Sequence, residues 1–118
     1  MKYLCLAYDE EEKFRAMSPA EWQALRAETL AFVEALHTSG QLLASEALQS
    51  AASAATLHMR DHCPLLSDGP FAETREQLDS FFLIEAQDFN EAIRIASQWP
   101  SARFGTIEIR PVCEDHHY

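Results

Sequence analysis

The order of secondary-structure signals constrains the fold of this chain most, because one pattern occurs twice: a strand, a helix and a second strand. In the first half, residues 3–8 form an apolar run, a helix signal follows, and residues 41–48 form the next strand. In the second half, the strands are residues 81–86 and 106–110, again with a helix between them. Two such units predict an α+β fold of ferredoxin-like split βαβ topology, with both helices on one face of the sheet.

The ends of the predicted helices are marked by specific residues. Ser18 and Glu21 have the spacing of a capping box, with Pro19 at the first helical position. Gly40 is the natural stop for that helix, and Pro100 ends the second one.

Three further segments lie outside the repeated pattern. The acidic run 9–13 is expected to be a solvated loop. Residues 56–60 and 64–67 are typical of two hairpin strands, inserted between the two units. No linker divides the sequence, so we expect a single domain over residues 1–118. A chain this small leaves apolar surface on the open sheet face, which favours a homodimer.

The composition excludes several classes of function. The net charge of −10 argues against nucleic acid and anionic membrane surfaces as partners. No apolar run approaches the ~20 residues that cross a bilayer, and the apolar N-terminal run is too short for a signal peptide. Cys5, Cys63 and Cys113 are odd in number and widely spaced, which predicts free thiols and a cytoplasmic location.

The most distinctive local pattern is the segment 68–78, with the sequence DGPFAETREQL. Gly69 suits a backbone conformation that a side chain would disfavour, and Pro70 fixes the next φ angle. The pattern therefore predicts a rigid polar turn, and such turns often carry binding or catalytic residues.

Two interpretations of this turn stay open. In the first, Asp68 or Glu73 accepts a proton, Arg75 holds an anionic ligand, and the closely placed acids raise one carboxyl pKa. In the second, the turn is bonded internally, with Asp68 capping backbone amides and Arg75 paired to Glu73 or Glu76.

A second group of candidates lies at the ends of the first two strands. The group consists of Tyr8, which ends the first strand, the following Asp9, and Glu46, which lies near the end of the second strand among small residues that leave room for a ligand. We expect Tyr8, Glu46, Asp68 and Arg75 to line one cleft near the dimer boundary. The alternative for Glu46 is a partly buried carboxylate bonded to backbone.

A metal site is not expected. His58 and His62 are four residues apart, a spacing that aligns ligands on a helix, whereas this segment is predicted to be a strand and a turn. His116 and His117 with Cys113 form a second group near the end of the chain. The sequence has no Gly-rich phosphate loop, and no cofactor is expected.

The segment 68–78 closely resembles the DGPF signature of the YCII-related family, and the resemblance continues through residues 81–112. It implies a dimeric α/β barrel in which two sheets pack face to face. The family often has a Gly-Gly pair where Asp79 and Ser80 stand here. Better known members are thought to use a His–Asp pair, and no clear equivalent of that His lies near the motif.

Two classes of function follow from these observations. The first is a cofactor-independent enzyme that performs acid/base chemistry on a small organic molecule, with Asp68, Glu46 and Glu73 as acid/base candidates. Tyr8 and Arg75 would bind or orient the ligand. The second is a non-catalytic module that binds a small ligand or a protein. The family resemblance suggests an extracytoplasmic-function sigma factor as such a partner.

Overall fold

The computed structural model describes residues 1–114. In chain order its elements are β1 (Lys2–Glu10), α1 (Glu11–Arg15), α2 (Pro19–Thr38), β2 (Leu42–Ala47), the 3-10 turn η1 (Ala51–Ser53), β3 (Ala55–Arg60), β4 (Cys63–Asp68), β5 (Glu76–Glu85), α3 (Phe89–Ala96), the 3-10 turn η2 (Pro100–Arg103) and β6 (Thr106–Pro111).

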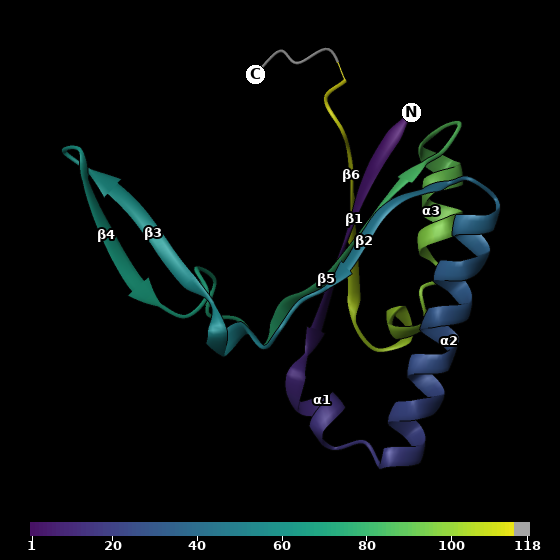
Figure 1. Cartoon of the computed structure of the whole chain (residues 1–118), viewed down its shortest axis with the longest axis horizontal. Helices are drawn as coiled ribbons and strands as arrows, with labels where there is room; N and C mark the ends of the chain where they lie inside the picture. Colours follow the sequence, from purple (N-terminus) through teal and green to yellow (C-terminus); the bar gives the residue numbers. More distant parts are fainter. Residues whose placement is uncertain (115–118) are drawn as a thin grey trace.

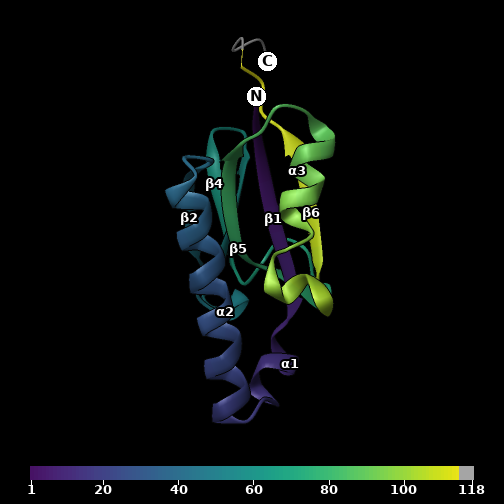
Figure 2. The same ribbon diagram turned by 90° about the vertical axis from the view of Figure 1, so that its right-hand side faces the viewer.

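Four strands form an antiparallel sheet in the order β2-β5-β1-β6. β1 and β2 run in the same direction because β5 lies between them and pairs antiparallel with both. β5 and β6 are likewise parallel to each other, because β1 lies between them and pairs antiparallel with both. Each helix therefore connects two parallel but non-adjacent strands, which is the predicted split βαβ arrangement. Figure 2 shows α2 and α3 together in front of the sheet, so both helices cover one face.

Helix α2 begins and ends where its sequence signals predict. The Ser18 hydroxyl accepts from the Glu21 amide at 3.2 Å, and the Glu21 carboxylate accepts from the Ser18 amide at 3.1 Å. Both halves of the capping box are thus formed. After the last turn the chain reverses through Gly40, whose φ of +78° falls in the region that favours glycine.

The core lies between the helices and the covered face of the sheet. Strand β1 contributes every second residue to it, and Tyr3, Cys5 and Ala7 are fully buried. The ring of Phe82 stacks on Trp99 with centroids 4.7 Å apart. These contacts fix which face of each strand meets the helices, because strand side chains alternate.

Two predicted boundaries were wrong. The run 9–13 is not a solvated loop: Asp9 belongs to β1 and is only 2% exposed, and a short helix, α1, follows. Arg15 stabilises that helix through ion pairs with Glu11 and Glu12 one turn earlier. Strand β5 begins at Glu76, inside the segment predicted to be a turn, so it is long enough to pair with the whole of β1.

The predicted hairpin is present and forms an arm of its own. β3 and β4 pair around Asp61 and His62, which both have positive φ angles, as a two-residue hairpin turn requires. Figure 1 shows this arm projecting from the side of the sheet opposite the helices. Leu57 lies opposite Leu66 on one face of the arm, and both side chains are more than half exposed.

No helix within the described part of the chain is long and apolar enough to cross a membrane.

Candidate functional site

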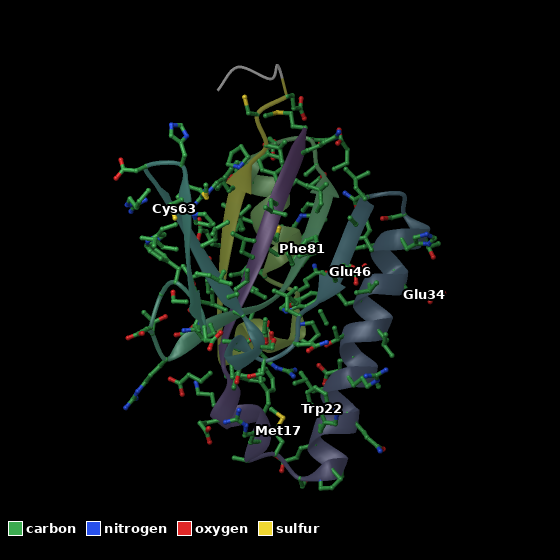
Figure 3. The ribbon with its side chains drawn as sticks, turned by 60° about the vertical axis from the view of Figure 1, so that its left-hand side comes forward. Met17, Trp22, Glu34, Glu46, Cys63 and Phe81 are labelled. Carbon is green, nitrogen blue, oxygen red and sulfur yellow. The ribbon has the colours of Figure 1, made fainter. Side chains whose placement is uncertain are left out.

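A cavity of about 620 Å³ lies between helix α2 and the edge of the sheet formed by β2 and β5. The C-terminal half of α2 packs on the core through Phe32, Val33 and Leu36, and the cavity runs along the helix from Trp22 to Val33. The volume is in the range of small-molecule sites. Figure 3 labels Trp22 of α2, Glu46 of β2 and Phe81 of β5, which border the cavity.

An irregularity in β5 brings a carboxylate to this cavity. Ala7 pairs with Ser80 and Tyr8 pairs with Leu78, so Asp79 is an extra residue in the ladder, a β-bulge. In a regular strand Asp79 would point to the face of Phe81, away from the helices. The bulge turns its side chain toward Asp9, whose pKa Asp79 helps to raise, and Asp79 also lines the cavity.

Asp9 lies behind Asp79 and continues the buried face of β1. The Ser101 hydroxyl donates a hydrogen bond to Asp9 Oδ2 at 3.3 Å. Gly105 packs so closely over the carboxyl that a Cβ atom there would lie 1.9 Å from Asp9 Oδ1. That oxygen has no hydrogen-bond partner of its own among the described residues.

The surroundings of this acid pair favour a bound proton. Burial raises the pKa of Asp9 from 3.8 to about 8, with further contributions from the hydrogen bond and the charge of Asp79 and from the charge of Glu76. Burial also raises the pKa of Asp79. Two carboxyls that share a buried hydrogen bond cannot both ionise readily, so the pair retains one proton near neutral pH.

A further carboxylate of the cavity wall, that of Glu11, links two elements of the structure. Glu11 of α1 accepts hydrogen bonds from the Ala51 amide at 2.7 Å and the Ser50 hydroxyl at 2.9 Å. These bonds lower the pKa of Glu11, with a smaller contribution from Arg15. Glu11 therefore remains ionised and fastens the segment after β2 to α1.

Of the five residues predicted to form the site, Glu46 alone lines this cavity. Glu46 pairs directly with Phe81, and Phe81 with Leu6, so the side chains of these residues stand on the face of the sheet away from the helices. Glu46 thus borders the cavity from the edge strand. Tyr8, which alternates with Ala7 along β1, is half-buried and stands on the same open face.

The other three predicted residues lie in or after the hairpin arm. Asp68 is the last residue of β4, and Asp68, Glu73 and Arg75 are all exposed. Within residues 1–114, Arg75 forms no ion pair and the Asp68 side chain accepts no hydrogen bond. Within the described residues, these three side chains do not line the cavity that Glu46 borders, and Asp68 and Arg75 lack the bonds of the second interpretation.

The motif turn is held mainly through its backbone. Gly69 has a φ of +97°; its amide donates to the Ala54 carbonyl at 2.7 Å, and its carbonyl accepts from the Thr56 hydroxyl at 2.8 Å. The Gln77 side chain donates to two carbonyls of the turn. Phe71 is 79% exposed, and its ring packs edge-to-face with that of His58. These bonds explain the glycine by backbone geometry.

Sequence analysis includes Asp9 in the second candidate group but does not select its partner Asp79. Because Asp9 follows an apolar strand and precedes four more charged residues, the sequence also places it in a solvated loop. Asp79 stood out only as a departure from a Gly-Gly pair. The available signal was the alternation Tyr3, Cys5, Ala7, which extends to Asp9 and predicts that this acid faces the core.

Residues 1–114 contain no cluster of three or more side chains able to hold a metal ion. His116 and His117 lie outside the described residues.

The comparisons with known proteins agree with the fold. The family description "YCII-related domain" matches residues 1–115. An uncharacterised protein of Rhizobium meliloti is 32% identical over 114 residues, covering 95% of this chain and 92% of the relative. A similar solved structure is the 5-chloro-2-hydroxyhydroquinone dehydrochlorinase of Burkholderia phenoliruptrix in complex with 2,5-dihydroxybenzoquinone. It has a TM-score of 0.57 and 15% identity, covering 96% of this chain and 94% of that one.

Proposed function

This chain belongs to the YCII-related family, and we propose that it is a cofactor-independent enzyme that moves protons on a small organic molecule bound beside α2. One observation carries the proposal: Asp79 lines a cavity of ligand size and lies against the buried Asp9, and burial raises the pKa of both carboxyls. A structural ion pair would need a cation, and none of residues 1–114 supplies one to this pair.

The acid pair can both accept a proton from a ligand and donate one to it. With one proton between them, Asp79 accepts a second proton from a ligand, and the resulting neutral diacid returns it to another position or to a leaving group. Ser101 keeps Asp9 oriented throughout. Groups with a pKa near the working pH are the most effective general acids and bases, and proton transfer of this kind contributes ~10² to 10⁴ in rate.

Glu46 remains a candidate second acid or base at the rim of the cavity. The site roles predicted for the other four residues remain predictions, and they depend on the formation of a dimer. These residues are Asp68, Glu73, Tyr8 and Arg75. Because Tyr8 stands on the open face and the other three lie on or beside the arm, a second copy packed on that face would be needed to bring them together.

We further propose that two copies form the α/β barrel expected for the family. The open face carries Leu6 and Phe81 beside each other, and the arm adds the exposed Leu57 and Leu66. Exposed apolar side chains that lie together in this way often mark a protein interface. The free thiols of Cys5 and Cys63 are consistent with the proposed cytoplasmic location.

The enzyme proposal is tested by turnover. A panel of small phenols, enols and carbonyl compounds is screened, beginning with 5-chloro-2-hydroxyhydroquinone, the compound named for the structural neighbour. Asp79→Asn and Asp9→Asn should each lower any activity found by ~10² or more. Asp61→Asn, an exposed turn residue, serves as the matched control and should retain activity. Wild-type turnover in both Asp79→Asn and Asp9→Asn would refute the assignment.

A binding module is the second candidate, favoured by the exposed apolar face of the arm together with the net charge of −10. Charge of one sign on a surface accelerates association with a basic partner. The test is direct binding of purified extracytoplasmic-function sigma factors from the same organism at low salt. Absence of binding by all of them would count against this candidate.

A further inference from the structure

The two cations that line the cavity differ in their partners. Arg15 is held by Glu11 and Glu12 of its own helix. Arg26 of α2 also lines the cavity, yet it has no ion pair and no hydrogen bond with any described residue. Arg26 is exposed, and of the two basic residues that line the cavity it is the one whose guanidinium no described carboxylate holds.

The wall around Arg26 is apolar. Trp22 lies one helical turn before it, on the same side of α2, and Leu25 and Val33 continue that wall. Trp99 also lines the cavity. A ligand that fills this space therefore needs an apolar body, and aromatic side chains favour a planar ring stacked on or against them.

We infer that the natural ligand is a small carboxylic acid with an apolar, ring-sized body, whose carboxylate pairs with Arg26 and whose reacting end lies at Asp79. This inference rests on the proposed function, because Asp79 is taken as the group that exchanges protons with the ligand. The planar fork of an arginine matches a carboxylate with two parallel hydrogen bonds.

A carboxylate fits better than a phosphate ester. A phosphate dianion is usually held by several cations or by a row of backbone amides at a helix N-terminus. Here a single guanidinium is free, and the acids Glu46 and Asp79 line the same cavity and would repel a second negative charge. One negative charge is what Arg26 can neutralise.

Benzoate and its uncharged analogue benzamide are suitable probes, because they share a ring and differ in charge. Binding is followed at pH 7 by the fluorescence of the two tryptophans and by calorimetry. We expect wild type to bind benzoate at least about tenfold more tightly than benzamide, as a charge-assisted hydrogen bond predicts. In Arg26→Gln that preference should disappear, while Arg26→Lys should keep part of it.

Arg94→Gln is the matched control, because it removes the same charge from the exposed face of α3, outside the cavity. It should bind both probes as wild type does. Circular dichroism confirms that each variant is folded, and Arg26→Lys replaces Arg26→Gln if the latter is not. Equal affinity for the two probes in wild type, binding of neither probe, or an unchanged preference in Arg26→Gln would overturn the inference.

The experiment separates this inference from the proposed function. Asp79→Asn should retain the preference for benzoate, since Arg26 supplies it, even though proton transfer is lost. A benzoate preference that depends on Arg26, found together with turnover that is insensitive to Asp79→Asn, would support the acid site and refute only the catalytic assignment.

Discussion

Replacing Asp9 by Asn should change how the stability of this protein depends on pH. In the folded chain the pKa of Asp9 is about 8, against an ordinary value of 3.8. Between these values the folded protein holds a proton that the unfolded chain releases, so the folded state loses stability as the pH rises. The contribution is fully present below pH 4 and is lost as the pH passes 8.

The loss of unfolding free energy depends on how far the pH rises within the range between the two pKa values. One retained proton corresponds to about 1.4 kcal/mol of unfolding free energy for each pH unit, so wild type should lose about 3 kcal/mol between pH 5 and 7. The raised pKa of Asp79 acts in the same direction. The lowered pKa of Glu11 acts in the opposite direction, but only below its ordinary value of 4.5, outside this range.

Asn is uncharged at every pH and close to Asp in shape, and its amide can still donate to Asp79. Asp9→Asn should therefore flatten the slope and be more stable than wild type at pH 8. Urea unfolding at fixed protein concentration measures this: with a denaturant slope of about 1–3 kcal/mol per molar, the wild-type midpoint should fall by roughly 1–3 M.

The exposed turn residue Asp61 provides the control. Asp61 has a φ of +51°, which Asn tolerates well, so Asp61→Asn should reproduce the wild-type slope. If wild type keeps constant stability from pH 5 to 7, or if Asp9→Asn shows the same slope as wild type, Asp9 is not protonated in the folded chain and the reasoning fails.

Three further changes test other parts of the structure. Gly105→Ala places a methyl group 1.9 Å from Asp9 Oδ1 and should cost about 1–3 kcal/mol in thermal unfolding; an unchanged melting temperature would contradict that packing. Ser18→Ala removes the cap of α2 and should cost about 1 kcal/mol, measured the same way, whereas no loss would mean that the cap contributes nothing. Leu66→Lys should convert a dimer into a monomer in sedimentation, while Ile93→Lys on α3 should not; a wild-type monomer, or a Leu66→Lys dimer, would refute the role of the arm.

The elements of the fold were predictable because their signals are local. A capping box involves residues three apart, so Ser18 and Glu21 identify the start of α2 without any knowledge of the rest of the chain. The hairpin depends on a short turn between two apolar runs. The doubled order of strand, helix and strand then limits the topology, since each helix must return the chain to the same sheet.

The acid pair was not predictable in the same way, because it depends on register. Asp9 and Asp79 lie at opposite ends of the fold in sequence and meet only because β1 pairs with β5. The bulge that turns Asp79 toward the helices adds one residue to a ladder whose pairing the sequence does not specify. The alternation of buried residues along β1 does extend to Asp9. The acidic residues that follow Asp9 nevertheless favour a solvated loop, so the sequence alone does not place Asp9 in the core.

Asp79 stands at a position where the family resemblance leads us to expect glycine. The family resemblance places a Gly-Gly pair where Asp79 and Ser80 stand, and glycine suits a bulge because it tolerates unusual backbone angles. A glycine there would leave Asp9 without the partner that shares its proton. The motif turn at Gly69 has its own backbone requirement and holds the base of the arm, away from the cavity. The acid pair and the cavity beside α2 are therefore the place from which a search for the substrate should begin.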